Sequence, residues 1–318
     1  MQTRMKRLYL YGTLAGVLYG LVLRVLFGGT HNNLLELMSV GFLFLVPLVL
    51  GVLAISFADK PSWKYSIFFP WVPILLFVAM TALFGLEGII CIVMALPLFL
   101  IMGSLGGICS KLVMKSRHRM QIFTGFLLLP ILTSAVESRM DLPNEIHTVH
   151  TEIVINAPQD EVWKNIIRVP AIQPHEHHFS FFHLIGFPKP IEATLSHEGV
   201  GGVRHATFEG GVLFVETITK WEEKTNIVFS IKADTETIPA TTLDQHVTIG
   251  GEYFDMLEGE YRLEPIDDTR IRLHLYSKQR LSTRFNAYTA LWTESIMRDI
   301  QDYILKVIKR RCETAPLA

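Results

Sequence analysis

The stretch "STRFNAYTALWTESIMRDIQDYILKVIKRR" at residues 282–311 decides the fold of the second half of the chain. Its apolar residues recur at steps of three and four, which predicts one long helix with an apolar stripe. The stripe comprises Tyr288, Leu291, Trp292, Ser295, Ile296, Ile300, Tyr303, Ile304, Val307 and Ile308. Ser282 or Thr283 is suited to cap its start, and basic residues near its end offset the negative end of the helix dipole. A helix this long requires a broad apolar partner, so we expect a sheet that wraps around it.

The composition points to two domains and a membrane portion. The chain has 318 residues, of which 50% are hydrophobic and 19% are charged, which is more apolar than an ordinary soluble protein. Its net charge of −1 provides no global field that would recruit nucleic acid, so we expect no nucleic-acid partner. Its three cysteines form neither a disulfide framework nor a CxxC metal motif, and we expect them to be small buried residues.

Residues 1–139 consist almost entirely of apolar runs and are predicted to form a transmembrane region of about five helices. The runs occupy residues 8–27, 34–57, 66–84, 86–109 and 121–136. Each is about the length needed to cross a hydrocarbon core of roughly 30 Å, and the fifth is the weakest because it is short and contains Pro130. Arg24 lies near the outer end of the first run, where we expect it to snorkel. No charge lies in the middle of a run, so the pattern indicates an anchor and no ion path.

The basic residues between the runs predict an orientation. Lys and Arg gather before the first run and in the second and fourth loops, whereas the intervening loops carry none. This pattern places the N-terminus in the cytoplasm. Five spans in an inner or plasma membrane then place residues 147–318 on the extracytoplasmic side. If the fifth run lies in the membrane interface instead, the same residues are cytoplasmic.

Residues 147–318 read as a domain of mixed helix and strand. A strand at 149–155 precedes a short helix from Pro158 to about Val169, and residues 172–190 are irregular and rich in His and Phe. The apolar period then switches to two, which predicts further strands at 191–197, 203–209, 212–221, 225–233, around 246–249, 259–264 and 270–277. The expected fold is α+β, a curved antiparallel sheet around the long C-terminal helix.

Residues 154–163, "VINAPQDEVW", resemble the opening motif of the START/polyketide-cyclase superfamily, often called SRPBCC, in which a strand with this ending leads into the first short helix. The closing helix matches as well, and the resemblance covers roughly residues 147–312. It implies a helix-grip fold with a cavity between sheet and helix. Members of the superfamily bind lipids, sterols, polyketides or hormones, and a minority catalyse cyclisation, dehydration or hydrolysis. The superfamily has no universal catalytic residue that could be carried over to this chain.

A set of polar and aromatic residues is predicted to line such a cavity. The candidates are Arg204, Phe208, Phe214, Glu216, Phe229, His246, Tyr261, Tyr288 and Trp292. If Glu216 faces the helix, burial raises the pKa of its carboxyl unless a cation pairs with it, and Arg204 on the neighbouring strand is the expected cation. Such a pair would orient the polar head group of a ligand. The alternatives are a structural ion pair, or two side chains that face water.

Other polar clusters give weaker signals. His175, Glu176, His177 and His178 invite a metal site, but zinc requires three or four converging ligands and no second cluster follows nearby, so no metal or other cofactor is expected. His246, near Asp244, resembles an acid–base pair, although a structural hydrogen bond is the favoured interpretation. The glycines at 199–202 and 250–251 precede no helix and therefore indicate turns, not phosphate loops.

The patterns together favour a membrane-anchored domain that binds an apolar ligand, such as a lipid or an isoprenoid, with membrane lipids as its other partners. The first alternative is an enzyme of the cyclase or dehydratase type that uses Glu216, Arg204 or His246. The second is an interaction domain without a ligand. A single buried charge pair in an apolar slot would favour binding, whereas two unpaired titratable groups would favour catalysis.

Overall fold

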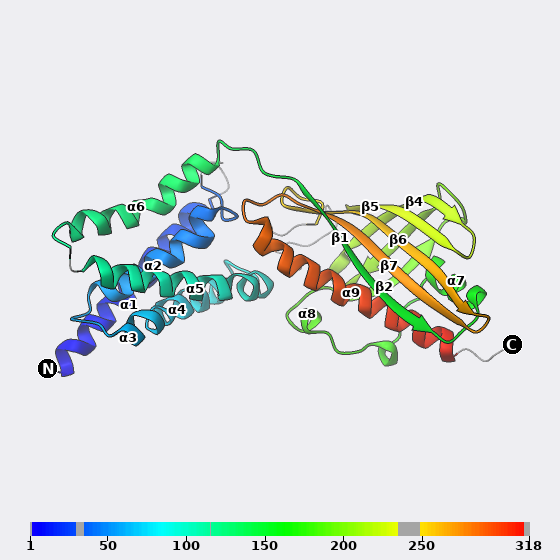
Figure 1. The fold of residues 1–318 in the computed structure, drawn as a ribbon, viewed down its shortest axis with the longest axis horizontal. Coiled ribbons are helices and arrows are strands. Elements are labelled where there is room, and N and C mark those ends of the chain that lie inside the picture. Colours follow the sequence, from blue (N-terminus) through cyan, green and yellow to red (C-terminus); the bar gives the residue numbers. More distant parts are fainter. Residues whose placement is uncertain (1, 30–34, 115, 235–248, 315–318) are drawn as a thin grey trace. The chain divides into compact units, whose positions relative to one another are not determined.

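The chain divides into two compact units, Met1–Leu142 and Pro143–Ala318. The computed structural model describes residues 2–29, 35–114, 116–234 and 249–314 (Figure 1). The first unit is helical in the part described, and the second combines helices with one sheet.

The helices of the first unit reproduce most of the predicted apolar runs. They are α1 (Gln2–Phe27), the π-helix η1 (Gly41–Leu45), α2 (Val46–Ser56), α3 (Trp63–Phe68), α4 (Trp71–Leu83), α5 (Ile89–Val113) and α6 (Arg119–Glu137). Among the described residues, four helical stretches are long and apolar enough to cross a membrane, namely Tyr9–Phe27, Trp63–Leu83, Ile89–Val113 and Arg119–Glu137. The second predicted run contains the shorter apolar helix Gly41–Ser56.

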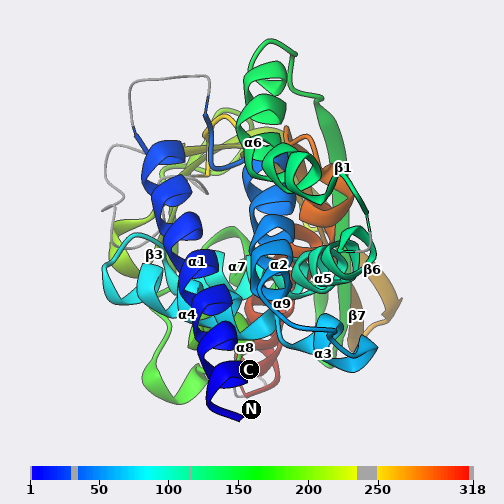
Figure 2. The same ribbon diagram turned by 90° about the vertical axis from the view of Figure 1, so that its left-hand side faces the viewer.

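Helix α2 is the most buried element of this unit, and it lies between α1 and α5 (Figure 2). Glycines permit its close packing against α5. A Cβ on Gly51 would lie 2.0 Å from the carbonyl oxygen of Gly103, and a Cβ on Gly106 would lie 1.8 Å from the carbonyl oxygen of Leu48. Small residues at such contacts are the usual means by which helices approach each other in membranes.

The charged groups of this unit hold its helices together. Arg24 donates hydrogen bonds to the carboxylate of Glu87 and to the carbonyl of Leu86, and its side chain is only 8% exposed. Arg24 thus pairs with a carboxylate near the end of α1, and its snorkelling in a membrane stays a prediction. Glu137, at the end of α6, accepts hydrogen bonds from the backbone N–H groups of Val40 and Gly41 at 3.1 and 3.0 Å. It thereby satisfies donors at the start of η1, where the helix dipole favours a negative charge.

The second unit contains one seven-stranded antiparallel sheet. Its elements are β1 (Glu145–Ile155), α7 (Gln159–Ile167), η2 (Pro174–Glu176), α8 (Phe181–Leu184), β2 (Pro190–Leu195), β3 (Val203–Phe208), η3 (Glu209–Gly211), β4 (Leu213–Glu222), β5 (Asn226–Asp234), β6 (Phe254–Asp267), β7 (Arg270–Leu281) and α9 (Asn286–Thr314). The strand order is β1-β7-β6-β5-β4-β3-β2. The sheet curves around α9 (Figure 1), which confirms the predicted fold class.

Two local predictions concern the start of α9 and the strand expected around residues 246–249. Helix α9 begins at Asn286, because the Asn286 side-chain oxygen accepts hydrogen bonds from the backbone N–H and the hydroxyl of Thr283, at 2.7 and 2.9 Å. Ser282 donates to Asn144. The contact between the Thr283 N–H and a side chain three residues later is one half of a capping box, so of the two predicted caps Thr283 is the one that the hydrogen bonds support. Most of the strand expected around 246–249 lies outside the described residues, and Ile249 forms an isolated bridge with Phe254.

The buried face of α9 also differs from the predicted stripe. Its buried residues are Asn286, Thr289, Thr293, Ile296, Met297, Gln301, Tyr303, Leu305, Val307, Ile308 and Cys312. Leu291 was expected on the stripe but is 66% exposed, whereas Leu305 was not expected and is fully buried. Ile304 is only partly buried, at the edge of the core. The helix contacts β1 and β7 on one side and the segment around residues 172–187 on another, so its buried surface is wider than one stripe.

A buried glutamine fastens α9 to the sheet. The side-chain N–H₂ of Gln301 donates to the Ser277 hydroxyl at 2.8 Å and to the Val149 carbonyl at 3.3 Å. The Thr151 hydroxyl donates to its side-chain oxygen at 3.1 Å. Gln301 is 1% exposed, so these bonds satisfy polar groups that would otherwise be costly to bury. They fix the register of α9 against β1 and β7.

Candidate functional site

The predicted pair of Arg204 and Glu216 is present on the sheet face that α9 covers. The two residues lie directly opposite each other in β3 and β4, and a guanidinium N–H of Arg204 donates to the Glu216 carboxylate. Arg204 is 4% exposed and Glu216 is 6% exposed. The alternative in which both side chains face water is therefore wrong.

Aromatic rings surround the cation of this pair. The Arg204 guanidinium carbon lies 5.5 Å from the ring centroid of Phe229 and 5.9 Å from that of Tyr261. Both rings belong to the core cluster that includes Leu305 and Ile308 of α9. Cation–π contacts of this kind become stronger when the groups are desolvated. The structure thus brings four of the predicted residues together, Arg204, Glu216, Phe229 and Tyr261.

The electrostatics of the pair follow from its burial. Burial raises the pKa of the Glu216 carboxyl, and Arg204 opposes that effect only in part. Burial disfavours the charge on Arg204, but Glu216 and then Tyr261 outweigh it, so the pKa of Arg204 is raised. The Nε–H of Arg204 is buried and has no hydrogen-bond partner among the described residues. A buried donor without a partner is costly, and a bound acceptor would satisfy it.

Phe208 and Phe214 extend the same face. Their rings form an edge-to-face pair with centroids 5.3 Å apart, and both are half-buried. They pack against a second apolar cluster formed by Val169, Ala193 and Ala206. Phe214 lies opposite Ala206 in the β3–β4 register, two residues from the Arg204–Glu216 pair. The pair is therefore flanked by an aromatic core on one side and by half-buried rings on the other.

Three further candidates are not part of this group. Tyr288 and Trp292 are half-buried and lie in the first half of α9, beside the buried Thr289 and Thr293. The residues of α9 in the core cluster around the pair come from its second half. His246 lies outside the described residues, as does the neighbouring Asp244.

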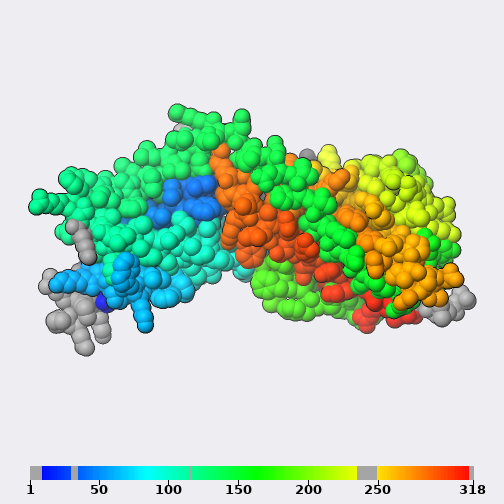
Figure 3. Space-filling view, viewed as in Figure 1, coloured from blue at the N-terminus to red at the C-terminus, as the bar shows by residue number. Residues whose placement is uncertain are grey.

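The members of the histidine-rich segment contact different partners. Glu176 accepts hydrogen bonds from Arg311 at 2.6 and 2.8 Å, and these bonds lower the pKa of its carboxyl to about 2. His177 forms a hydrogen bond with the Tyr303 hydroxyl, and His178 stacks on the same ring with centroids 4.1 Å apart. The segment is thus fastened to α9. Figure 3 shows the outer side of α9 at the surface, between β1 and this segment.

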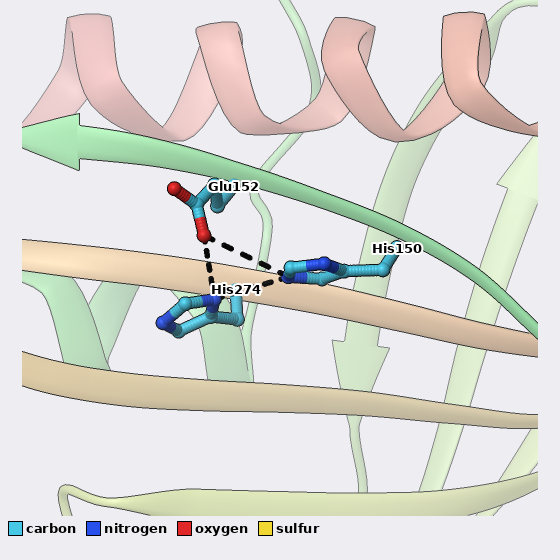
Figure 4. A group of neighbouring side chains, drawn as sticks. All are labelled: His150, Glu152 and His274. Atoms are coloured by element: carbon cyan, nitrogen blue, oxygen red, sulfur yellow. Dashed lines mark hydrogen bonds and ion pairs between the residues drawn. The ribbon is translucent and has the colours of Figure 1, made fainter.

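A different cluster was missed by the sequence analysis. His150 and Glu152 of β1 converge with His274 of β7 on the sheet face that points away from α9 (Figure 4). Burial, and then the nearby His274, lower the pKa of His150. The signal in the sequence was a His-x-Glu pair in a strand, but its partner lies 124 residues away. Only the pairing of β1 with β7 brings them together.

The chain matches no protein-family model, and it matches no curated protein. The search of solved structures finds START and aromatase/cyclase proteins. The Zhui aromatase/cyclase from a Streptomyces species is 15% identical, with 53% of this chain and 94% of that chain covered and a TM-score of 0.34. A START superfamily protein from Mycobacterium smegmatis is 10% identical, with 52% and 97% covered and a TM-score of 0.34. The norcoclaurine synthase from Thalictrum flavum, in truncated form, is 14% identical, with 53% and 97% covered and a TM-score of 0.32.

Proposed function

We propose that the second unit binds an apolar ligand that carries a hydrogen-bond acceptor, such as a lipid or an isoprenoid, between the sheet and α9. The observation that supports this proposal most directly is the buried Arg204–Glu216 pair, with a free Nε–H on Arg204 and aromatic rings around it. Glu216 holds the guanidinium in place, and the free N–H is available to the polar end of the ligand. The apolar part of the ligand would contact rings such as Phe208 and Phe214.

Binding accounts for this arrangement better than a structural or a catalytic role. A buried ion pair gives little net stability compared with well-packed apolar side chains, so stability alone is a weak reason for its presence. A general acid or base requires a titratable group that is free to exchange a proton with the substrate. Glu216 is engaged by Arg204, and among the described residues on this face no second free carboxylate or imidazole contacts the pair. Binding is therefore the favoured function, and the cyclase or dehydratase alternative is kept as one possible result of the experiment below.

The first unit is proposed to anchor this domain in an inner or plasma membrane, with the N-terminus in the cytoplasm. The four long apolar helices support the anchor. If the buried helix Gly41–Ser56 also crosses, the number of spans is five and the second unit is extracytoplasmic. A reporter fused after Ala318 tests this: activity of a periplasmic or extracellular reporter supports five spans. Activity of a cytoplasmic reporter alone contradicts that number.

The ligand proposal is tested on the full chain, purified in a mild detergent and analysed by native mass spectrometry. The wild-type protein should carry an apolar molecule that survives delipidating washes. The double variant Arg204→Met/Glu216→Met keeps the volume apolar and removes both charges, so retention of the ligand should fall at least about tenfold if one charged hydrogen bond is lost. Arg262→Met is the matched control, because Arg262 is 53% exposed and pairs with Glu260 on the same sheet.

The outcomes separate the three functions. Equal retention by the wild type, the double variant and the control would show that the pair does not recognise the ligand. A wild-type protein that carries nothing, even after incubation with lipid and isoprenoid mixtures, would favour an interaction domain. A bound molecule that is chemically converted during incubation, and is not converted by the double variant, would favour the enzyme.

A further inference from the structure

The outer face of the sheet carries a group of side chains whose potential metal-ligand atoms lie close together. His150 and Glu152 are two residues apart on β1 and so lie on the same face, and His274 of β7 is directly opposite Glu152. Figure 4 shows the imidazole rings and the carboxylate turned toward one another. Among the described residues this is the group of three potential metal ligands whose ligand atoms all lie within 4.8 Å of one another.

The distances within the group are those of ligands around one metal ion. The His150 Nε2 atom lies 3.0 Å from His274 Nδ1, which lies 3.2 Å from Glu152 Oε2. The third edge, from His150 Nε2 to Glu152 Oε2, is 4.0 Å. Zinc holds nitrogen and oxygen ligands at about 2.0–2.2 Å in a tetrahedron, so its ligand atoms are about 3.3 Å apart. The triangle therefore fits three corners of a zinc site after small side-chain adjustments.

The second ring nitrogen of His274 contacts a carboxylate that fixes the orientation of the ring. Its Nε2 lies 3.0 Å from Glu264 Oε2, and His274 is 8% exposed. When Nε2–H donates to Glu264, the lone pair of Nδ1 faces the carboxylate of Glu152 and the ring nitrogen of His150. Two such acceptors repel each other unless a proton or a cation lies between them. A carboxylate on the far nitrogen is also the usual second contact of a metal-bound histidine.

We propose that His150, Glu152 and His274 bind a divalent transition-metal ion, zinc by the chemistry of the ligand set, and that Glu264 is the positioning residue for His274. Two imidazoles and one carboxylate are a ligand set that zinc accepts, with water in the fourth position. Arg272 lies 3.8 Å from the other oxygen of Glu152 and 3.6 Å from Glu264, so it offsets negative charge and leaves Glu152 Oε2 to the metal.

The site would cross-link the edge of the sheet. β1 is the edge strand, paired with β7 alone, and it directly follows the connector from the first unit. A metal bound by two residues of β1 and one of β7 would hold that edge in register. The expected role is thus structural, and it is independent of the ligand proposed for the other face.

The test is calorimetric titration of zinc into the full chain in detergent, after removal of metals with a chelator. One zinc should bind per chain. Glu264→Gln removes only the carboxylate that contacts the far ring nitrogen of His274, and it should weaken zinc binding roughly 10- to 100-fold. His150→Gln removes a metal ligand, at a side chain that is 39% exposed, and should weaken zinc binding by more than that. His147→Gln is the matched control, because the two carboxylates near His147 contact opposite ring nitrogens and cannot share one metal with it.

Two further readouts separate a metal site from an ion-pair cluster. Zinc should raise the Tm of the wild type and of His147→Gln, and should leave that of His150→Gln unchanged. Cobalt in place of zinc should show the visible absorption of a four-coordinate ion in the wild type. Variants that lack His150 or His274 should not show it. If the wild type binds zinc no more tightly than His150→Gln, or if His147→Gln loses as much affinity, the proposal is wrong. The cluster is then a network of hydrogen bonds and ion pairs.

Discussion

The two faces of the sheet differ in how deeply their ion pairs are buried. On the face toward α9, Arg204 and Glu216 form a fully buried pair among aromatic rings. On the outer face, pairs such as Lys278–Glu258 are 49% and 35% exposed. Consecutive residues of the same strands supply both faces, because side chains alternate. The comparison teaches that burial, not the kind of pair, decides whether a charge contributes to recognition, to stability or to neither.

The largest loss of stability is expected when only one member of the buried Arg204–Glu216 pair is replaced. Arg204→Met leaves the Glu216 carboxylate buried without a partner, which should cost about 3–5 kcal/mol of unfolding free energy at neutral pH. Without the cation, burial raises the pKa of Glu216 further above its unfolded value. The variant should therefore regain stability as the pH falls and the carboxyl becomes neutral. Denaturant unfolding followed by tryptophan fluorescence at two pH values measures both effects.

The double variant Arg204→Met/Glu216→Met provides the control for this prediction. It should recover most of the loss, since replacing both members of a buried pair with apolar side chains is often neutral or stabilising. If the single variant costs less than about 1 kcal/mol, as exposed pairs do, the contrast between the two faces is not one of burial.

The second prediction extends the comparison to the two sides of α9. Leu305 is fully buried against the core cluster, so Leu305→Ala should cost about 2–5 kcal/mol. Leu291 is 66% exposed, and Leu291→Ala should change the unfolding free energy by no more than about 0.5 kcal/mol. The same denaturation experiment compares them. Equal losses would mean that the buried side of α9 has been assigned incorrectly.

The third prediction concerns a carboxylate that ties the irregular segment to α9. Arg311 lowers the pKa of Glu176 to about 2, below its unfolded value. The stabilisation is therefore fully present above about pH 4.5 and is lost as the pH falls toward 2. Allowing for solvent screening, the loss should be on the order of 2 kcal/mol. In thermal melts across this range, Glu176→Gln should show a flatter decline than the wild type, and Asp160→Asn, an exposed control, should follow the wild type.

The smallest effect is expected on the outer face. Lys278→Gln removes one partner of an exposed pair and should change the unfolding free energy by about 0–1 kcal/mol, less at high salt. A loss above about 2 kcal/mol that does not respond to salt would show that this face carries interactions as strong as those of the buried pair.

Much of the fold of the second unit could be predicted from the sequence because the apolar residues of its strands recur at every second position and some turns, such as the one at Gly210 and Gly211, are short. The predicted ends of β4 and β5 differ from the observed ones by a residue. The start and the buried face of α9 could not be predicted as well. They depend on Asn286 reaching back to Thr283 and on contacts with the segment around residues 172–187, neither of which leaves a periodic signal.

The same distinction applies to the polar clusters, of which one could be predicted from the sequence and the other could not. Arg204 and Glu216 could be paired from the sequence because a tight turn at Gly210 and Gly211 joins their strands, so their register follows from counting. His150 and His274 could not be paired, because the register of two strands that are distant in the chain depends on the whole sheet. Whether a face is inside or outside is likewise settled only when α9 covers one of them.

The strand order has a consequence for how the chain acquires its fold. β2 to β7 form a meander in which each strand pairs with the next, so these pairs can form as the chain is made. β1 emerges before all of them, yet its partner β7 is among the last strands to appear, with Glu145 opposite Leu281. Contacts of such long sequence separation form late and slow folding. During synthesis the apolar side of β1 therefore stays exposed to solvent until β7 and α9 have left the ribosomal exit tunnel. We expect β1 to be the strand most prone to misfolding or aggregation during this time.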